Sequence, residues 1–257
     1  MTSEIKITPD WIRAAKSRGE RVAALTAYDY PTARLLDEAG VPIILVGDSV
    51  GMVVLGYPDT TQVTLAEMRH HVAAVARAKT KALVVGDLPY HTYQTAQNAV
   101  ANAYILMEAG ADAIKIEGGI AVKEELDALR DAGIPVMAHI GMLPQNIKVD
   151  GGYKIKGRSE AERERLFADA LTVQEAGAFA VVIELVEPEL AGEITGKLSI
   201  PTIGIGSGTH CYGNILVTHD LVGAFPWFRP KFAVAKADVA SSIRSAAEGF
   251  VKQVREE

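Results

Sequence analysis

Hydrophobic and polar positions follow a repeating order along the chain, in which a short apolar run precedes a segment of helical periodicity. Short apolar runs are typical of strands buried on both faces, and apolar residues at three- and four-residue spacing predict helices. The strands are expected at 22–27, 43–46, 82–85, 113–116, 135–138, 179–183, 201–205 and, more weakly, 231–234. Helices are expected at 8–18, 31–39, 65–78, 96–109, 122–132, 160–176, 189–198 and 237–254.

Strands that alternate with helices pair in parallel through right-handed crossovers. About eight such units in a chain of this length predict an α/β protein, a (β/α)8 TIM barrel with an N-terminal helix. The alternative is a doubly wound open sheet. That fold favours a glycine-rich phosphate turn after the first strand, where this chain has Tyr-Asp-Tyr-Pro at 28–31. No linker or shift in composition divides the chain, so we expect one barrel domain over 1–257.

Composition narrows the classes of partner. With 257 residues, 49% hydrophobic and 23% charged, the chain can bury a large core, and no apolar run reaches the roughly 18 residues of a membrane span. Residues 1–11 show no export signal, and the single cysteine, Cys211, suggests a reducing compartment. We therefore expect a cytoplasmic protein. A net charge of −6 argues against nucleic-acid binding.

Ionisable residues mark the carboxyl ends of the predicted strands, which converge on one mouth in a barrel. They are Asp29, Asp48, Asp87, Glu117, His139 and Glu184. A single acid at a strand end is often a helix cap or a structural hydrogen-bond acceptor. For Asp29 this structural role is the alternative to a role in the site. Converging carboxylates repel one another and protonate unless a cation holds them. Oxygen ligands with open positions suit Mg²⁺ or a similar hard ion.

Lys115 lies two residues before Glu117 on a predicted strand, so both side chains share one face. A lysine at the mouth needs an anion. One candidate partner for Lys115 is a substrate carboxylate, and another is a carbonyl with which it forms a Schiff base. The alternative is a structural ion pair with Glu117 or Asp87.

The charges also suggest a chemistry. A Mg²⁺ ion held by Asp48 and Asp87 can chelate the keto and carboxylate oxygens of a 2-oxo acid and stabilise an enolate. A further carboxylate near the neighbouring carbon serves as the base, and Glu184 is the candidate. The expected class is metal-assisted proton abstraction followed by formation or cleavage of a carbon–carbon bond.

These residues lie within phrases that resemble the ketopantoate hydroxymethyltransferase family nearly end to end. They include Leu45-Val46-Gly47-Asp48-Ser49, Asp87-Leu88-Pro89, Lys115-Ile116-Glu117-Gly118-Gly119, His139-Ile140-Gly141 with Pro144-Gln145, and Gly151-Gly152-Tyr153-Lys154. The resemblance implies a Mg²⁺-dependent barrel enzyme of pantothenate and coenzyme A synthesis. Such an enzyme transfers a hydroxymethyl unit from methylenetetrahydrofolate, its co-substrate, to 3-methyl-2-oxobutanoate and forms 2-dehydropantoate.

The resemblance also implies roles by position. Asp48, Asp87 and Glu117 match the metal site, and Asp48, Ser49, Asp87 and Lys115 match the contacts to the keto acid. Glu184 matches the proton acceptor, His139 lies beside the site, and the family forms a homodecamer.

The chain departs from the family at Tyr212-Gly213-Asn214, where Asp-Gly-Gln is common. We expect this segment near the mouth loops after the seventh strand, in contact with folate or another subunit. The apolar loop 50–55 is expected to form a wall for the substrate's isopropyl group or to pack between subunits. The alternatives to the transferase are another Mg²⁺-dependent 2-oxo acid lyase or decarboxylase on the same barrel, and a non-catalytic scaffold.

Overall fold

The computed structural model describes residues 5–257, so the first four residues of the stretch examined for an export signal lie outside the described residues. The chain divides into two compact units, one up to residue 215 and one over 216–257. The first unit contains almost the whole barrel and every candidate site residue.

Eight parallel strands close into a barrel in the order of the sequence, from β1 to β8. They are β1 (Val22–Thr26), β2 (Ile43–Val46), β3 (Leu83–Asp87), β4 (Ala113–Glu117), β5 (Val136–Gly141), β6 (Ala180–Glu184), β7 (Thr202–Ile205) and β8 (Gly213–Leu216). The predicted (β/α)8 barrel is confirmed.

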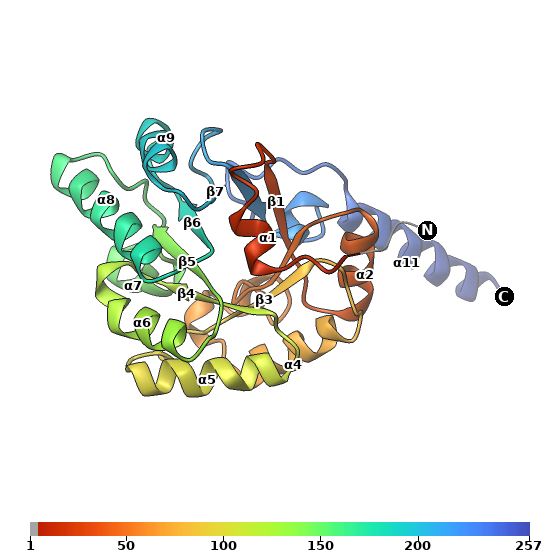
Figure 1. Cartoon of the computed structure of the whole chain (residues 1–257). Helices are drawn as coiled ribbons and strands as arrows, with labels where there is room; N and C mark the ends of the chain where they lie inside the picture. Colours follow the sequence, from red (N-terminus) through yellow and green to blue (C-terminus); the bar gives the residue numbers. More distant parts are fainter. Residues whose placement is uncertain (1–4) are drawn as a thin grey trace. The chain divides into compact units, whose positions relative to one another are not determined.

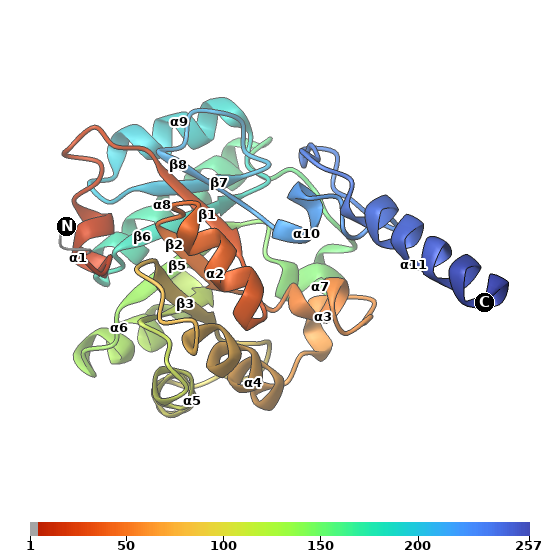
Figure 2. The ribbon, with the colours of Figure 1, turned by 90° about the vertical axis from the view of Figure 1, so that its right-hand side faces the viewer.

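Helices surround the strands of the first unit (Figures 1 and 2). They are α1 (Pro9–Arg13), α2 (Tyr30–Glu38), α4 (Leu65–Ala76), α5 (Ala96–Glu108), α6 (Lys123–Asp131), α8 (Glu160–Glu175) and α9 (Pro188–Lys197). Their ends agree with the sequence signals. Ser159 and Thr64 each accept a hydrogen bond from the backbone N–H three residues on, in capping boxes at the starts of α8 and α4. The N-terminal helix is shorter than the predicted 8–18.

The two longest loops contain short helices that periodicity did not predict. The loop after β2 holds α3 (Val50–Val53) and a 3₁₀ turn at Thr60–Gln62, and the loop after β5 holds a 3₁₀ turn at Pro144–Asn146 followed by α7 (Ile147–Asp150). Lys148 joins the loops, because its ammonium donates to Thr61 Oγ1 at 2.8 Å.

The barrel interior follows the two-residue period of the strands. Leu83 and Val85 of β3 and Ala113 of β4 belong to a buried cluster inside the barrel, whereas Val84, Ile114 and Ile116 pack outward against the helices. Continuing each inward series by two residues leads to Asp87 and Lys115. Polar side chains therefore begin at the carboxyl end of the barrel, directly above an apolar floor.

The predicted eighth strand at 231–234 is wrong. The segment lies outside any strand, and Ala233 N–H donates to Pro230 O in a turn. The eighth strand is Gly213–Leu216, which is short and exposes Asn214, so it lacks a continuous apolar run. It passes so close to β1 that a Cβ on Gly213 would lie 2.1 Å from Val22 O, a contact only glycine permits.

The expected place of Tyr212 near the mouth loops is also wrong. Its backbone N–H donates to Oγ1 of Thr202, the first residue of β7, at 3.1 Å. The Tyr212 hydroxyl donates to Lys16 O at 2.9 Å. These contacts place Tyr212 at the amino-terminal end of the barrel, because the segment precedes β8 instead of extending β7.

The second unit contains α10 (Thr218–Leu221) and α11 (Val239–Glu256). Lys236 N–H donates to Leu221 O and Val239 N–H donates to Val222 O, so the chain between the two helices folds back on itself. Among the described residues, no helix combines the length and apolar character needed to cross a membrane.

Candidate active site

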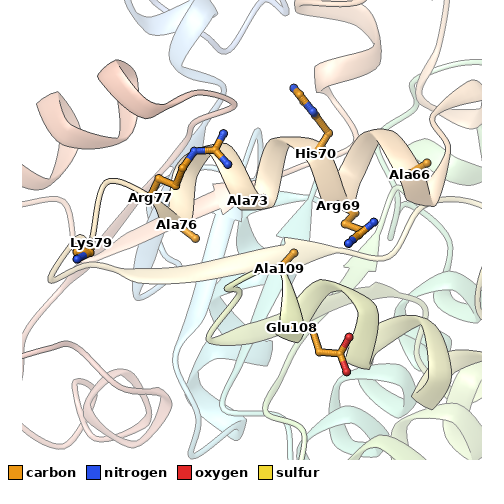
Figure 3. Close-up of a pocket in the computed structure, with 9 residues that line it drawn as sticks. All are labelled: Ala66, Arg69, His70, Ala73, Ala76, Arg77, Lys79, Glu108 and Ala109. Carbon is orange, nitrogen blue, oxygen red and sulfur yellow. The ribbon is translucent and has the colours of Figure 1, made fainter.

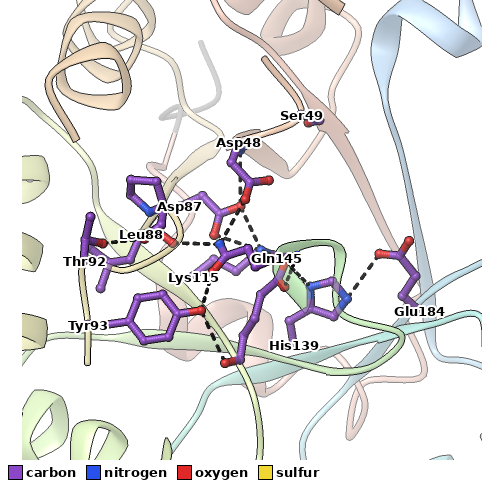
Figure 4. A network of polar contacts seen from close by, with 12 residues as sticks. Asp48, Ser49, Asp87, Leu88, Thr92, Tyr93, Lys115, His139, Gln145 and Glu184 are labelled. Atoms are coloured by element: carbon purple, nitrogen blue, oxygen red, sulfur yellow. Dashed lines mark hydrogen bonds and ion pairs between the residues drawn. The ribbon is translucent and has the colours of Figure 1, made fainter. Parts of the chain in front are cut away.

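Buried ionisable side chains gather at the carboxyl ends of five consecutive strands, from β2 to β6 (Figure 4). The strand register sets them side by side, with Asp87 opposite Lys115, Glu117 opposite His139, and Gly141 opposite Glu184. All of these ionisable side chains are buried. A buried charge is costly without a partner, so the contacts among these groups decide what the site can do.

Lys115 is the counterion at the centre of this group. Its Nζ lies 2.8 Å from both carboxylate oxygens of Asp87 and 3.3 Å from Glu117 Oε1. Burial lowers the pKa of Lys115, but the charges of Asp87 and Glu117 outweigh burial and raise it well above its usual value. The ammonium is therefore permanently charged, and the structure has the ion pair that was one alternative for this lysine.

His139 bridges the central carboxylates to Glu184. Its Nδ1 lies 3.3 Å from Glu117 Oε1 and its Nε2 lies 3.2 Å from Glu184 Oε2. Both are ion-pair distances, although neither ring nitrogen meets the angles of a hydrogen bond. Burial lowers the pKa of His139, and Glu117 and Glu184 together raise it to about 9. The imidazolium form therefore dominates at neutral pH.

The raised pKa of His139 predicts a pH-dependent contribution to stability. Because the folded pKa of about 9 exceeds the ordinary 6.5, the stabilisation is complete below pH 6.5 and is lost as the pH rises through 9. Replacing His139 by glutamine should cost of the order of 3 kcal/mol at pH 6 and much less at pH 9.5. Urea unfolding of metal-free protein at both pH values measures this difference.

The matched control for that experiment is His70→Gln, because His70 is exposed on α4. It should leave the pH profile unchanged. A His139→Gln variant whose deficit is the same at pH 6 and pH 9.5 would show that the imidazole is neutral in the folded protein.

Asp48 completes the group from the end of β2. Its backbone N–H donates to Asp87 Oδ2 at 3.4 Å, so the two residues adjoin. Burial and the charges of Asp87 and Glu117 raise the pKa of the Asp48 carboxyl well above its usual value. The four carboxyl groups of the site therefore outnumber its two cations, Lys115 and His139, and a further cation would favour the ionised form of Asp48.

The donor set fits Mg²⁺ with two protein ligands. Within residues 5–257, no group of three or more His, Cys, Asp or Glu side chains has metal-centre spacing. Mg²⁺ is commonly held by one or two carboxylates, with water or substrate oxygens in the other positions, and Asp48 with Asp87 meets that need. Both oxygens of Asp87 contact Lys115 Nζ, and both oxygens of Glu117 also face protein donors, since Oε1 lies near Lys115 and Oε2 accepts from Gln145 N–H at 3.1 Å. The role of Glu117 as a third ligand stays a prediction.

Glu184 is placed by a close approach between strands. Met142 N–H donates to Glu184 O at 2.8 Å, directly after Gly141. Gly141 has φ +97°, and a Cβ there would lie 2.3 Å from Glu184 O. Glycine at 141 is required for the loop after β5 to turn against β6, and this turn keeps Glu184 beside His139.

Two predicted residues lie apart from the buried group. Asp29 caps α2, accepting the Thr32 N–H at 2.8 Å, so the structural interpretation of Asp29 is confirmed. Ser49 follows Asp48, but its hydroxyl forms a 2.9 Å hydrogen bond with the Tyr28 hydroxyl and lies away from the other labelled side chains (Figure 4). Its role as a substrate contact stays a prediction.

Sequence reasoning assigned no role to Gln145, Tyr93 or Tyr153. Gln145 is buried and contacts Asp48, and Tyr93 donates to Gln145 Oε1. Tyr153 lies in the long loop after β5, and its hydroxyl is 3.9 Å from Met52 Sδ of α3. Burial, followed by the charges of Glu184 and Asp48, raises the pKa of Tyr153. The phrase Pro144-Gln145 was the only sequence signal for Gln145.

A cavity of about 780 Å³ lies elsewhere, on the outside of the barrel. Residues of α4 and the end of α5, among them Arg69, Arg77 and Glu108, line it (Figure 3). None of the predicted site residues lines this cavity, so it is separate from the chemistry described above.

Comparison with known proteins assigns the family. A model of the family described as ketopantoate hydroxymethyltransferase matches residues 6–257. The chain belongs to the ketopantoate hydroxymethyltransferase family. It is 52% identical over 256 residues to 3-methyl-2-oxobutanoate hydroxymethyltransferase of Hyperthermus butylicus, covering 99% of this chain and 88% of that protein. The enzyme of the same name from Moorella thermoacetica is 50% identical over 258 residues, covering 100% of this chain and 96% of that protein.

Solved structures support the fold of this ketopantoate hydroxymethyltransferase family member. A phosphonopyruvate hydrolase, solved with oxalate and Mg²⁺, matches with a TM-score of 0.66 at 15% identity, over 97% of this chain and 88% of that one. Phosphoenolpyruvate phosphomutase of Streptomyces platensis subsp. rosaceus matches with a TM-score of 0.67 at 16% identity, with the same coverage. The predictions of barrel, family and enzyme are therefore confirmed, whereas the individual site residues stay predictions.

Proposed function

We propose that this chain transfers a hydroxymethyl group from methylenetetrahydrofolate to 3-methyl-2-oxobutanoate, forming 2-dehydropantoate for pantothenate and coenzyme A synthesis. The observation that carries the proposal is the buried group of Asp48, Asp87, Lys115, His139 and Glu184, in a chain about half identical, over its whole length, to enzymes of that name. A different Mg²⁺-dependent lyase or decarboxylase has less support, because the relatives carry the transferase name.

The residues divide the chemistry among themselves. Mg²⁺, when held by Asp48 and Asp87, supplies Lewis acidity to the keto acid and makes the C3 proton easier to remove. Glu184 accepts that proton, and C3 then forms a carbon–carbon bond to the one-carbon unit of methylenetetrahydrofolate. Both C–N bonds of that methylene group break, water supplies the hydroxyl oxygen, and tetrahydrofolate leaves with the proton on its nitrogen. His139 keeps Glu184 in place, with its Nε2 3.2 Å from Glu184 Oε2. Lys115 and Ser49 are the proposed contacts for the substrate's own oxygens.

Removal of metal gives a direct test. In a coupled assay with both substrates, EDTA should lower the rate of 2-dehydropantoate formation at least about tenfold, because the keto acid then lacks the Lewis acid that makes its C3 proton easier to remove. Excess Mg²⁺ should restore the rate. Unchanged turnover in EDTA would contradict a metal-dependent mechanism. Consumption of the keto acid without any folate would favour the lyase or decarboxylase.

Three further properties belong to the proposal. The family resemblance implies a homodecamer, which sedimentation velocity of the full chain measures. We also propose that residues 1–257 act as one domain, and that the chain works in the cytoplasm, where its single cysteine, Cys211, stays reduced.

A further inference from the structure

Gln145 connects the ends of three strands at the base of the site. Its backbone N–H donates to Glu117 Oε2 at 3.1 Å, at the end of β4. Its side-chain Nε2 donates to Asp48 Oδ2 at 2.9 Å, at the end of β2, and to Leu88 O at 3.0 Å, after β3. The residue is buried. Both hydrogens of the amide are thus committed, one of them to a proposed metal ligand.

Tyr93 determines which end of the amide faces Asp48. The partly buried Tyr93 hydroxyl donates to Gln145 Oε1, so the oxygen end of the amide is held on the side away from Asp48. The reversed amide would place a carbonyl oxygen against the Asp48 carboxylate and the Leu88 carbonyl, and acceptors repel one another. The hydrogen bonds therefore select a single orientation, with the NH₂ group toward Asp48 (Figure 4).

The two oxygens of Asp48 consequently differ. Oδ2 accepts the hydrogen bond from Gln145. No hydrogen bond to Oδ1 is found in the described part of the chain. A carboxylate held at one oxygen presents the other in a fixed direction. Loss of a residue that hydrogen-bonds to a metal ligand typically lowers metal affinity about 10- to 100-fold. We expect an effect of about that order here.

We propose that Gln145, oriented by Tyr93, is a positioning residue that fixes Asp48 so that Oδ1 faces the metal ion. The inference rests on the proposed function, in which Asp48 binds Mg²⁺. Gln145 acts through Asp48 and touches neither substrate nor metal. Its contribution lies in holding the ligand in its binding direction before the ion arrives.

Calorimetric titration of Mg²⁺ in the presence of saturating 3-methyl-2-oxobutanoate tests the inference without turnover. Replacing Gln145 by leucine should raise the Kd for Mg²⁺ about 10- to 100-fold. Replacing Tyr93 by phenylalanine should raise it by less, because Gln145 keeps its bond to Asp48. The matched control is Gln174→Leu, since Gln174 Oε1 accepts from Ser199 N–H and Oγ far from the site. That variant should bind Mg²⁺ as the unmodified chain does.

Two further readouts separate positioning from a general structural role. At saturating Mg²⁺ the Gln145→Leu variant should recover a kcat within about threefold of the unmodified chain, because excess ion compensates for a misdirected ligand. If leucine at 145 prevents folding, Gln145→Met provides a longer uncharged substitute, which also removes the hydrogen bond to Asp48 and should weaken Mg²⁺ binding about as much.

The outcomes distinguish this inference from the proposed function. Mg²⁺ binding within twofold of the unmodified chain in both Gln145 variants would overturn the inference and leave the proposed function standing. A kcat that stays low at saturating Mg²⁺, with an unchanged Kd, would also overturn it. Failure of the unmodified chain to bind Mg²⁺ would instead overturn the metal site of the proposed function, and the inference with it.

Discussion

The Glu184→Gln variant is expected to bind 3-methyl-2-oxobutanoate normally but to exchange its C3 proton about 10²- to 10⁴-fold more slowly than the unmodified chain. The amide has nearly the shape of the carboxylate but cannot accept the proton. The keto-acid contacts proposed for Ser49 and Lys115 do not involve Glu184, so binding should persist. Proton NMR of the keto acid in heavy water, with Mg²⁺ and without folate, measures the exchange alone.

A neighbouring acid provides the control for this substitution. Glu187 lies three residues further along the chain and pairs with Arg158, where its Oε1 accepts from Nε at 3.1 Å. Glu187→Gln should exchange the C3 proton at the normal rate. Exchange at the normal rate in Glu184→Gln would remove Glu184 as the base and leave the assignment of that role open among the other carboxylates.

The Lys115→Met variant should lose about 3–5 kcal/mol of unfolding free energy at pH 7, because it leaves buried carboxylates without their counterion. For a chain of this size, that loss lowers the melting temperature by roughly 2–4 °C per kcal/mol. Activity should fall as well, since Asp87 loses the ammonium that contacts both of its oxygens at 2.8 Å. Urea unfolding in EDTA measures the free energy.

The sign of the pH dependence follows from the carboxyl groups. Burial already raises the pKa values of Asp48 and Asp87, and removing the nearby positive charge raises them further. When the folded state raises the pKa of a carboxyl group, the contribution of that group to stability is fully present below the unfolded pKa. This contribution is lost as the pH rises through the folded pKa. The deficit of Lys115→Met should therefore shrink as the pH falls from 7 to 5.

The control for Lys115→Met is an exposed lysine in an ion pair. Lys123 pairs with Asp127 on the surface of α6, and exposed pairs contribute about 0–1 kcal/mol. Lys123→Met should change the unfolding free energy little at either pH. A Lys115→Met variant as stable as this control would show that the carboxylates are protonated in the metal-free protein.

Much of the site could be predicted because strand ends are readable in a sequence. An apolar run that ends in an acid places that acid at the mouth of a barrel, and Asp87 and Glu184 lie there as expected. Lys115 and Glu117 could be assigned to one face by their spacing alone. The same rule left Asp29 undecided, since a residue directly before a helix is also a natural cap, and the sequence does not distinguish the two uses.

The remaining features depend on contacts between distant segments. Gln145 and Asp48 are 97 residues apart, and an uncharged amide in a loop leaves no periodic pattern. The eighth strand was not predicted because it lacks an apolar run. Gly213 lies too close to the β1 backbone for a side chain, and Asn214 is exposed. The position of Tyr212 followed from that error, since its end of the barrel depends on which segment forms the last strand.

The ammonium of Lys115 also bears on how the enzyme is made and kept in the cell. Because the chain carries its own cation among the carboxylates, the barrel can fold completely before any metal ion enters. Under the proposed metal-dependent function, a shortage of magnesium should lower the activity of the existing molecules without exposing them to degradation, so that catalysis resumes when the ion returns, with no new synthesis.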